Sequence, residues 1–287
     1  MRLRMESWLR QKLGQIQVVS QSYQAARRIR LKLVRIEKRS LYKNIYYCCT
    51  QKTASQWLRA VFSDTIVFKY TGLKVLPYIQ LGLKYASFQD PFPVGTIGTH
   101  LYISYPVYCT IEKPDPYKTF FVLRDPRDII TSWYFSARHS HVPIPPVPEL
   151  RKDLQQINQD DGFKYIIDRL DDWGSFDTQR SWMGAEKEND AVRLFRYEEL
   201  AHDYVFFLES LFAYLDIKIP EEEFATLCER HTFKKYSGWR DQGVEDHHSH
   251  YRKGVPGDWK NYFNKDVADH FRLKTGDLLE VIGYKEE

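Results

Sequence analysis

Residues 118–137 read KTFFVLRDPRDIITSWYFSA and combine the signals of a strand, a turn and a helix. The first six, Lys118–Leu123, are rich in aromatic and β-branched residues and predict a buried strand. Asp125-Pro126 is typical of a helix N-cap followed by the first helical residue, so we predict a helix over Asp125–Ala137. A strand that passes through a polar turn into a helix is the repeating unit of an α/β fold.

The same order recurs along the chain. We predict further strands at Asn44–Cys49, Val94–Gly98 and Val192–Arg196, and further helices at Ser55–Asp64, Tyr197–Leu215 and Glu221–Arg230. Strands that alternate with helices predict a single α/β domain with a parallel, doubly wound sheet flanked by helices. Ligands of such sheets bind at the carboxyl ends of the strands, so the loops that follow the strands are the places to search.

The first such loop, residues 50–57 (TQKTASQW), lies between a predicted strand and a predicted helix. Backbone N–H groups at a helix N-terminus bind anions, and a lysine with hydroxyl groups in the same turn suits phosphate. The loop lacks both glycines of the nucleotide-hydrolase P-loop. An ordinary strand–helix turn therefore stays open as the alternative interpretation.

Two later segments also place cations where an anion could bind. Arg124 ends a predicted strand, and Ser132 lies one helical turn beyond Asp128. An arginine in this position suits a phosphate, although a structural salt bridge with Asp128 would explain it too. Tyr251–Lys260 reads YRKGVPGDWK, and its glycines allow the backbone to approach a ligand closely. A plain charged turn is the alternative for this segment.

Together the three segments resemble the PAPS-dependent sulfotransferase family, in particular its cytosolic type. Gln51–Trp57 stands at the place of the family's Pro-Lys-Ser/Thr-Gly-Thr-Thr-Trp loop, with Gln, Ala and Gln where the family has Pro, Gly and Thr. Arg124–Ser132 matches the Arg-x-Pro-x-Asp-x-x-x-Ser motif, and Arg252–Lys260 matches Arg-Lys-Gly-x-x-Gly-Asp-Trp-Lys throughout. The likeness covers about residues 44–284 and implies a P-loop-like phosphosulfate-binding loop.

The resemblance also implies a role for each site residue. The family transfers a sulfuryl group from PAPS to an acceptor hydroxyl, releases PAP and needs no metal. His100 would be the general base, Lys52 would neutralise the leaving oxygen, and Ser132 would bind the 3′-phosphate and hold Lys52 in position. Trp57 and Phe233 would sandwich the adenine. The residues expected to bind the nucleotide are Lys52, Thr53, Ala54, Ser55, Gln56, Trp57, Arg124, Ser132, Tyr197, Thr232, Phe233, Arg252, Lys253 and Gly254.

Aromatic residues near the catalytic segment predict a small, apolar or aromatic acceptor, because a charged polysaccharide would need an open basic cleft. The residues expected to wall this pocket are Phe88, Phe92, Trp133, Tyr134 and Phe135, with core packing as the alternative for each. The segment His139–Pro148 holds four prolines and is predicted to be an irregular lid.

The first 40 residues form a basic segment. Residues 1–43 hold twelve Lys and Arg, opposed only by Glu6 and Glu37, and apolar residues recur at helical spacing. We predict a basic helical extension over residues 1–40 and a sulfotransferase domain over residues 41–287. A packed arm, a peripheral contact with an anionic membrane and an organelle-targeting segment stay open. Without an apolar run of about 20 residues or a secretory signal, we expect a soluble, cytoplasmic protein.

The sequence also sets expectations about a metal, a nucleic-acid partner and a defined oligomer. His247, His248 and His250 are expected in a solvated loop rather than a zinc site, and the four cysteines lack metal-site spacing. We expect no nucleic-acid partner, and the oligomeric state stays open because Asn264-Lys265 breaks the family's dimer motif. The competing functions are a P-loop kinase acting on a small molecule, a carbohydrate or lipid sulfotransferase, and a non-catalytic binding protein.

Overall fold

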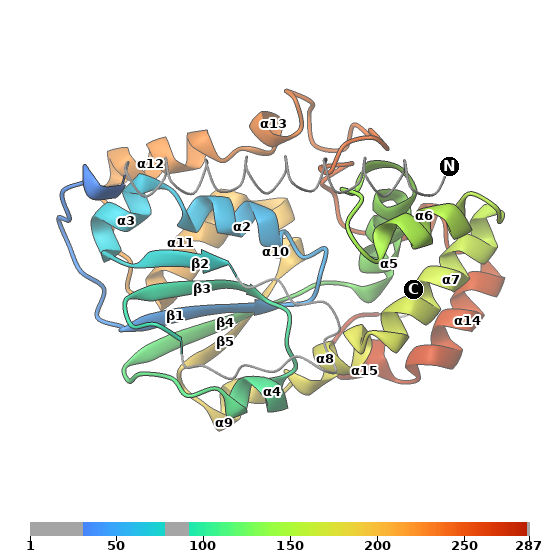
Figure 1. The fold of residues 1–287 in the computed structure, drawn as a ribbon, viewed down its shortest axis with the longest axis horizontal. Helices are drawn as coiled ribbons and strands as arrows, with labels where there is room; N and C mark the ends of the chain where they lie inside the picture. Colours follow the sequence, from blue (N-terminus) through green and yellow to red (C-terminus); the bar gives the residue numbers. More distant parts are fainter. Residues whose placement is uncertain (1–30, 78–91, 286–287) are drawn as a thin grey trace, which may run out of the picture.

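A computed structural model describes residues 31–77 and 92–285. These residues form a single α/β domain around a five-stranded, wholly parallel sheet (Figure 1). The strands are β1 (Asn44–Cys49), β2 (Lys74–Pro77), β3 (Thr96–Leu101), β4 (Tyr117–Leu123) and β5 (Val192–Arg196). Their order is β2-β3-β1-β4-β5, so β3, β1 and β4 lie inside the sheet and are paired on both edges.

Helices cover both faces of the sheet, and further helices lie beyond the carboxyl ends of the strands (Figure 1). One face carries α2 (Ser55–Phe62), α3 (Thr65–Thr71), α10 (Tyr197–His202), α11 (Tyr204–Tyr214), α12 (Glu221–Arg230) and α13 (Phe233–Tyr236). The other face carries α4 (Tyr105–Thr110), α8 (Ser175–Ser181), α9 (Ala185–Glu188) and α15 (Leu278–Val281). Beyond the strand ends lie α5 (Pro126–Phe135), α6 (Val147–Leu154), α7 (Gln159–Asp172) and α14 (Lys265–Thr275).

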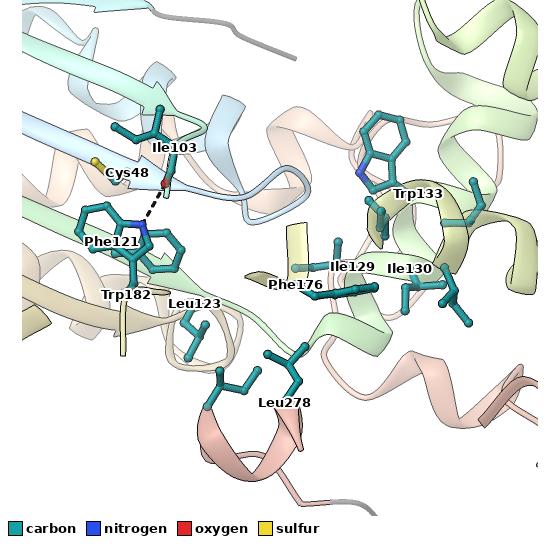
Figure 2. Packing of buried hydrophobic residues seen from close by; sticks show 14 of the residues in the cluster. Cys48, Ile103, Phe121, Leu123, Ile129, Ile130, Trp133, Phe176, Trp182 and Leu278 are labelled. Carbon is teal, nitrogen blue, oxygen red and sulfur yellow. Dashed lines mark hydrogen bonds between the residues drawn. The ribbon is translucent and has the colours of Figure 1, made fainter. Parts of the chain in front are cut away.

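The core consists of two apolar layers, because successive residues of a strand point to opposite faces of the sheet. In β1, Ile45, Tyr47 and Cys49 pack in one layer, whereas Tyr46 and Cys48 pack in the other, and all five are fully buried. In the second layer, the Trp182 ring stacks on Phe121 with centroids 4.8 Å apart, and its Nε1 donates to the Ile103 carbonyl at 2.9 Å (Figure 2). Packing on both faces thus holds the strands in place, and the loops that follow the strands start from a well-packed sheet.

The predicted segments Asn44–Cys49, Val192–Arg196 and Glu221–Arg230 are confirmed at both ends. The predicted strand Val94–Gly98 was placed too early, since β3 runs to Leu101 and contains His100. We missed β2, which is only four residues long, the helices α3 and α4, the helices between residues 147 and 188, and the helices α13, α14 and α15. No helix among the described residues is long and apolar enough to cross a bilayer.

Two predicted helices and the lid differ in detail. Helix α5 gives way at Ser136 to a π-helical turn, Ser136–Ser140, and α6 begins at Val147, so His139–Pro148 is irregular only in its middle. The predicted helix over Tyr197–Leu215 is broken at Asp203. The Asp203 carboxylate accepts hydrogen bonds from the first N–H groups of α11 at 3.0 Å, which starts a new helix there.

The predicted basic extension lies mostly outside the described residues. Of its residues, 31–40 are described, and the N–H groups of Glu37 and Lys38 donate to the Lys69 carbonyl at the end of α3. The boundary between residues 40 and 41 stays a prediction.

A buried carboxylate joins α5 to the C-terminal part of the chain. Asp128, only 1% exposed, accepts hydrogen bonds from the backbone N–H groups of Gly257 (2.7 Å) and Trp259 (3.1 Å). The neighbouring Arg127 guanidinium lies 3.7 Å from the centre of the Trp259 ring. Asp128 thereby fixes the segment that contains Arg252, Lys253 and Gly254 against the end of β4.

We expect Asp128→Ala to destabilise the fold by about 2–3 kcal/mol, because two backbone N–H groups lose a charged acceptor and stay buried. Urea unfolding followed by circular dichroism measures the change. Asp190→Ala removes an exposed aspartate and is the matched control, for which we expect less than about 0.5 kcal/mol. Equal stability of the two variants would mean that this connection is not structural.

Candidate active site

A cavity of about 600 Å³ opens at the carboxyl ends of β1 and β4. Twelve of the fourteen predicted nucleotide residues line it: Lys52, Ala54, Ser55, Gln56, Trp57, Arg124, Ser132, Tyr197, Phe233, Arg252, Lys253 and Gly254. The other two support its walls rather than face it. Thr53 is buried and its hydroxyl donates to the Thr50 carbonyl at 2.8 Å, while Thr232 caps α13.

The loop after β1 has an unusual backbone that is held by hydrogen bonds to neighbouring residues. Lys52 and Ala54 both have left-handed backbones, with φ of 67° and 59°, a region that residues other than glycine rarely enter. Arg124 donates to the Lys52 carbonyl at 2.5 Å, and the Tyr47 hydroxyl donates to the Thr53 carbonyl at 3.1 Å. The strain is retained because these bonds fix the loop around the cavity.

The lining of the cavity is strongly cationic. Five of its side chains are Lys52, Arg59, Arg124, Arg252 and Lys253, and no aspartate or glutamate lines it among the described residues. Burial, followed by the charges of Arg124 and Arg252, lowers the pKa of Lys52 to about 7. A doubly charged anion would relieve this repulsion, so the electrostatics select a phosphate-like ligand.

The cations of the second and third segments meet in the cavity. The Arg124 guanidinium lies 4.0 Å from the centre of the Tyr197 ring, and its buried Nε has no hydrogen-bond partner among the described residues. The alternative salt bridge to Asp128 is not formed, since within the described residues the Asp128 oxygens take up the Gly257 and Trp259 N–H groups instead. Arg124 therefore retains a donor for a ligand.

The closing segment is pre-oriented by its own acids. Arg252 pairs with Glu245 and Asp258, and Lys253 pairs with Asp258. Asp258 is only 3% exposed and does not line the cavity, so it holds both cations from behind. These contacts reduce the entropy that the two long side chains would lose on binding an anion.

Two flat rings, those of Trp57 and Phe233, line the cavity. The Trp57 indole is fixed by a hydrogen bond from Nε1 to the His231 carbonyl at 2.7 Å. The Phe233 ring packs on Gly254, where an added Cβ would lie 2.5 Å from the ring and the backbone has a φ of 75°. Only glycine allows the Arg-Lys-Gly turn and the ring to approach this closely.

His100 lies behind the cavity wall rather than in the lining. It is the last residue but one of the parallel strand β3, with a φ of 44°. It is fully buried, and its two ring nitrogens have no partner among the described residues. Burial, followed by the Arg59 charge, lowers its pKa to about 4. Its ring centroid is 5.6 Å from that of Tyr102, which does line the cavity.

The predicted acceptor wall was only partly correct. Trp133 lines the cavity and lies 5.2 Å from the Lys52 ammonium, whereas Phe92, Tyr134 and Phe135 are buried in the core. On α5, Trp133 lines the cavity while the next two residues, Tyr134 and Phe135, do not, a difference that residue type alone does not show. Phe88 lies outside the described residues.

Sequence reasoning missed several lining residues, among them Arg59, His141 and His250. His250 was expected in a solvated loop, but it faces the cavity, and burial followed by the Lys52 charge lowers its pKa to about 3. Arg59 could have been found, because it lies one helical turn after Ser55 and so shares its face of α2. No cluster of three metal-ligating side chains occurs among the residues that the structure describes.

Known proteins are similar to this chain in sequence. The Sulfotransferase domain profile matches residues 18–280. Guinea-pig (Cavia porcellus) 3-beta-hydroxysteroid sulfotransferase is 30% identical over 54% of this chain and 53% of its own length. Mouse (Mus musculus) Sulfotransferase 6B1 is 26% identical over 58% and 55%. The chain thus matches about half the length of these two relatives.

A longer match and a solved structure agree with these similarities. Human (Homo sapiens) Sulfotransferase 2A1 is 25% identical over 70% of this chain and 71% of its own length. The crystal structure of mouse sulfotransferase SULT7A1 complexed with PAP has a TM-score of 0.54 at 18% identity, and covers 84% of this chain and 86% of that one. The structural likeness shows the fold, and because the profile spans most of the sequence, this chain belongs to the sulfotransferase family.

Proposed function

We propose that this protein transfers a sulfuryl group from PAPS to a hydroxyl of a small, apolar or aromatic acceptor. The observation that carries the proposal is the meeting of Lys52, Arg124, Arg252 and Lys253 in one cavity that no described carboxylate lines. A kinase of the P-loop type would need a carboxylate near the phosphates to hold Mg²⁺. The described lining offers none, which favours a metal-independent transfer.

The residues of the cavity divide into those that would bind the two ends of the nucleotide. Arg124, Arg252 and Lys253 would hold the 3′-phosphate together with the Ser132 hydroxyl, and the rings of Trp57 and Phe233 would enclose the adenine. PAPS supplies the activated sulfuryl group. Lys52, in the loop after β1, would stabilise the charge that develops on the leaving phosphate oxygen.

His100 would accept the proton of the acceptor hydroxyl. Its lowered pKa keeps the imidazole neutral at pH 7, and no described protein group competes for its two ring nitrogens. The ring of Tyr102, which lines the cavity, lies next to it at 5.6 Å between centroids. The crystal structure of retinol dehydratase in complex with androsterone and PAP, with a TM-score of 0.52, concerns a protein of this fold with a compact apolar ligand.

We expect Arg252→Ala to weaken PAP binding by about 1.5–3 kcal/mol, because a charge-assisted contact with a dianion is lost. The affinity for adenosine 5′-phosphosulfate, which lacks the 3′-phosphate, should fall much less. Calorimetry with both nucleotides measures the difference. Lys260→Ala removes an exposed cation of the same segment outside the lining and should leave both affinities unchanged. Equal losses for the two nucleotides would show that Arg252 does not bind the 3′-phosphate.

We expect PAP binding at pH 8 to take up a proton. The pKa of Lys52 is about 7 without ligand, so the amine is mostly neutral at pH 8, and the bound anion favours its charged form. The phosphates of PAP are already ionised at this pH, since their second pKa is about 6. Calorimetry in two buffers of different ionisation enthalpy measures the uptake. Lys52→Arg is permanently charged and should bind PAP without uptake, and uptake that persists in this variant would assign the proton to another group.

We expect His100→Ala to abolish sulfuryl transfer while PAP binding changes by less than about threefold, or roughly 0.7 kcal/mol. Turnover with labelled PAPS and PAP titration measure the two effects. His202→Ala, an exposed histidine on α10, is the matched control and should retain activity. Near-normal turnover by the His100 variant would remove the base assignment.

A further inference from the structure

Part of the cavity is left over once the nucleotide residues are accounted for. This part, which we call the acceptor half, is lined by Arg59, Tyr102, Trp133, His250, Tyr251 and all but residue 143 of the segment 141–147. Val142, Ile144 and two prolines of that segment, together with the aromatic rings, make most of its surface apolar. An apolar or aromatic molecule would bury its body well here.

One permanently charged side chain interrupts this apolar lining. Arg59 lies on α2 one turn beyond Ser55, whose hydroxyl hydrogen-bonds with the Tyr102 hydroxyl at 2.9 Å. The Arg59 charge also acts on Tyr251, since it opposes the burial that raises the pKa of this phenol. The Arg59 charge therefore acts on both tyrosines that face the acceptor half.

Unlike Arg59, the two histidines of the acceptor half are uncharged. Burial, followed by the Lys52 charge, lowers the pKa values of both His141 and His250, so both rings are neutral at pH 7. The His141 Nδ1 is engaged by the Val142 carbonyl at 3.0 Å, and the His141 ring lies on Trp133 at 5.5 Å between centroids. Arg59 is the one Lys or Arg in the described lining of this half.

The other cations of the cavity have partners that Arg59 lacks. Arg252 and Lys253 are paired with acids, and Arg124 is bound to the Lys52 carbonyl. Within residues 31–77 and 92–285, Arg59 forms no ion pair. An unpaired guanidinium beside an apolar surface is a binding site for a planar anion, because its fork of N–H donors matches a carboxylate in two hydrogen bonds.

We infer that Arg59 recognises a carboxylate on the acceptor, so that the substrate is an apolar or aromatic hydroxyl compound with one negative charge. This inference rests on the proposed function and specifies its acceptor. The hydroxyl would face Lys52 and His100, while the carboxylate would reach the Arg59 side of α2. The nucleotide needs no contribution from Arg59, because its phosphates are met by the cations of the other segments.

The test is binding of matched phenols to the PAP-saturated protein, measured by calorimetry. The ligands are 3-(4-hydroxyphenyl)propanoate and 6-hydroxy-2-naphthoate, each compared with its own primary amide. We expect the wild-type protein to bind each acid at least tenfold more tightly than its amide. Arg59→Gln should reduce this ratio to below threefold, and Arg59→Lys should keep most of it, while PAP affinity stays within twofold in both variants.

Further arms separate this inference from the proposed function. Lys235→Gln removes an exposed cation outside the cavity and should leave the acid-to-amide ratio unchanged. Sulfuryl transfer from PAPS to the amides tests the proposed function without using the carboxylate. A wild-type protein that binds the acids no better than the amides, or binds neither, overturns the inference. A tenfold loss of PAP affinity in Arg59→Gln would overturn it as well, by assigning Arg59 to the nucleotide.

Discussion

The active site depends on the two hydrogen bonds by which the buried Asp128 carboxylate accepts the Gly257 and Trp259 N–H groups. Asp128 belongs to the helix that follows β4, whereas its donors lie about 130 residues later in the chain. Together with the contact of Arg127 on Trp259, this connection fixes Arg252 and Lys253 relative to Arg124. The hydrogen bonds thus convert two distant motifs into one anion site.

The cations of the site repel one another. Arg124 and Arg252 act on Lys52 together with burial, and the resulting pKa of about 7 shows that its charge is unfavourable without a ligand. Glu245 and Asp258 offset part of this repulsion around the closing segment. Because neither acid lines the cavity, an incoming anion would relieve the remaining repulsion and favour the charged form of Lys52. A rigid sheet with two fully packed layers stabilises the domain against this local cost.

The acceptor half differs from the nucleotide part in both shape and chemistry. Its walls come from the segment between the π-helical turn and α6, from Tyr102 after β3, and from the loop that ends at Tyr251. His100 is fully buried outside the lining, with its ring centroid 5.6 Å from that of Tyr102. Neutral imidazoles and aromatic rings surround Lys52 on this side, and Arg59 supplies a fixed charge at a different point of the wall.

The local pattern of the sequence was sufficient for the strands β1 and β5, for α12, and for the three cationic segments, because buried strands and helix caps depend on neighbouring residues. Twelve of the fourteen predicted nucleotide residues line one cavity for the same reason, since parallel strands bring their carboxyl ends to one edge. Only the tertiary structure decided that Phe92, Tyr134 and Phe135 pack in the core while Trp133, Arg59 and His250 face the cavity. Residue type does not distinguish a buried ring from a ring that lines a cavity, because the difference depends on which distant segment packs against it.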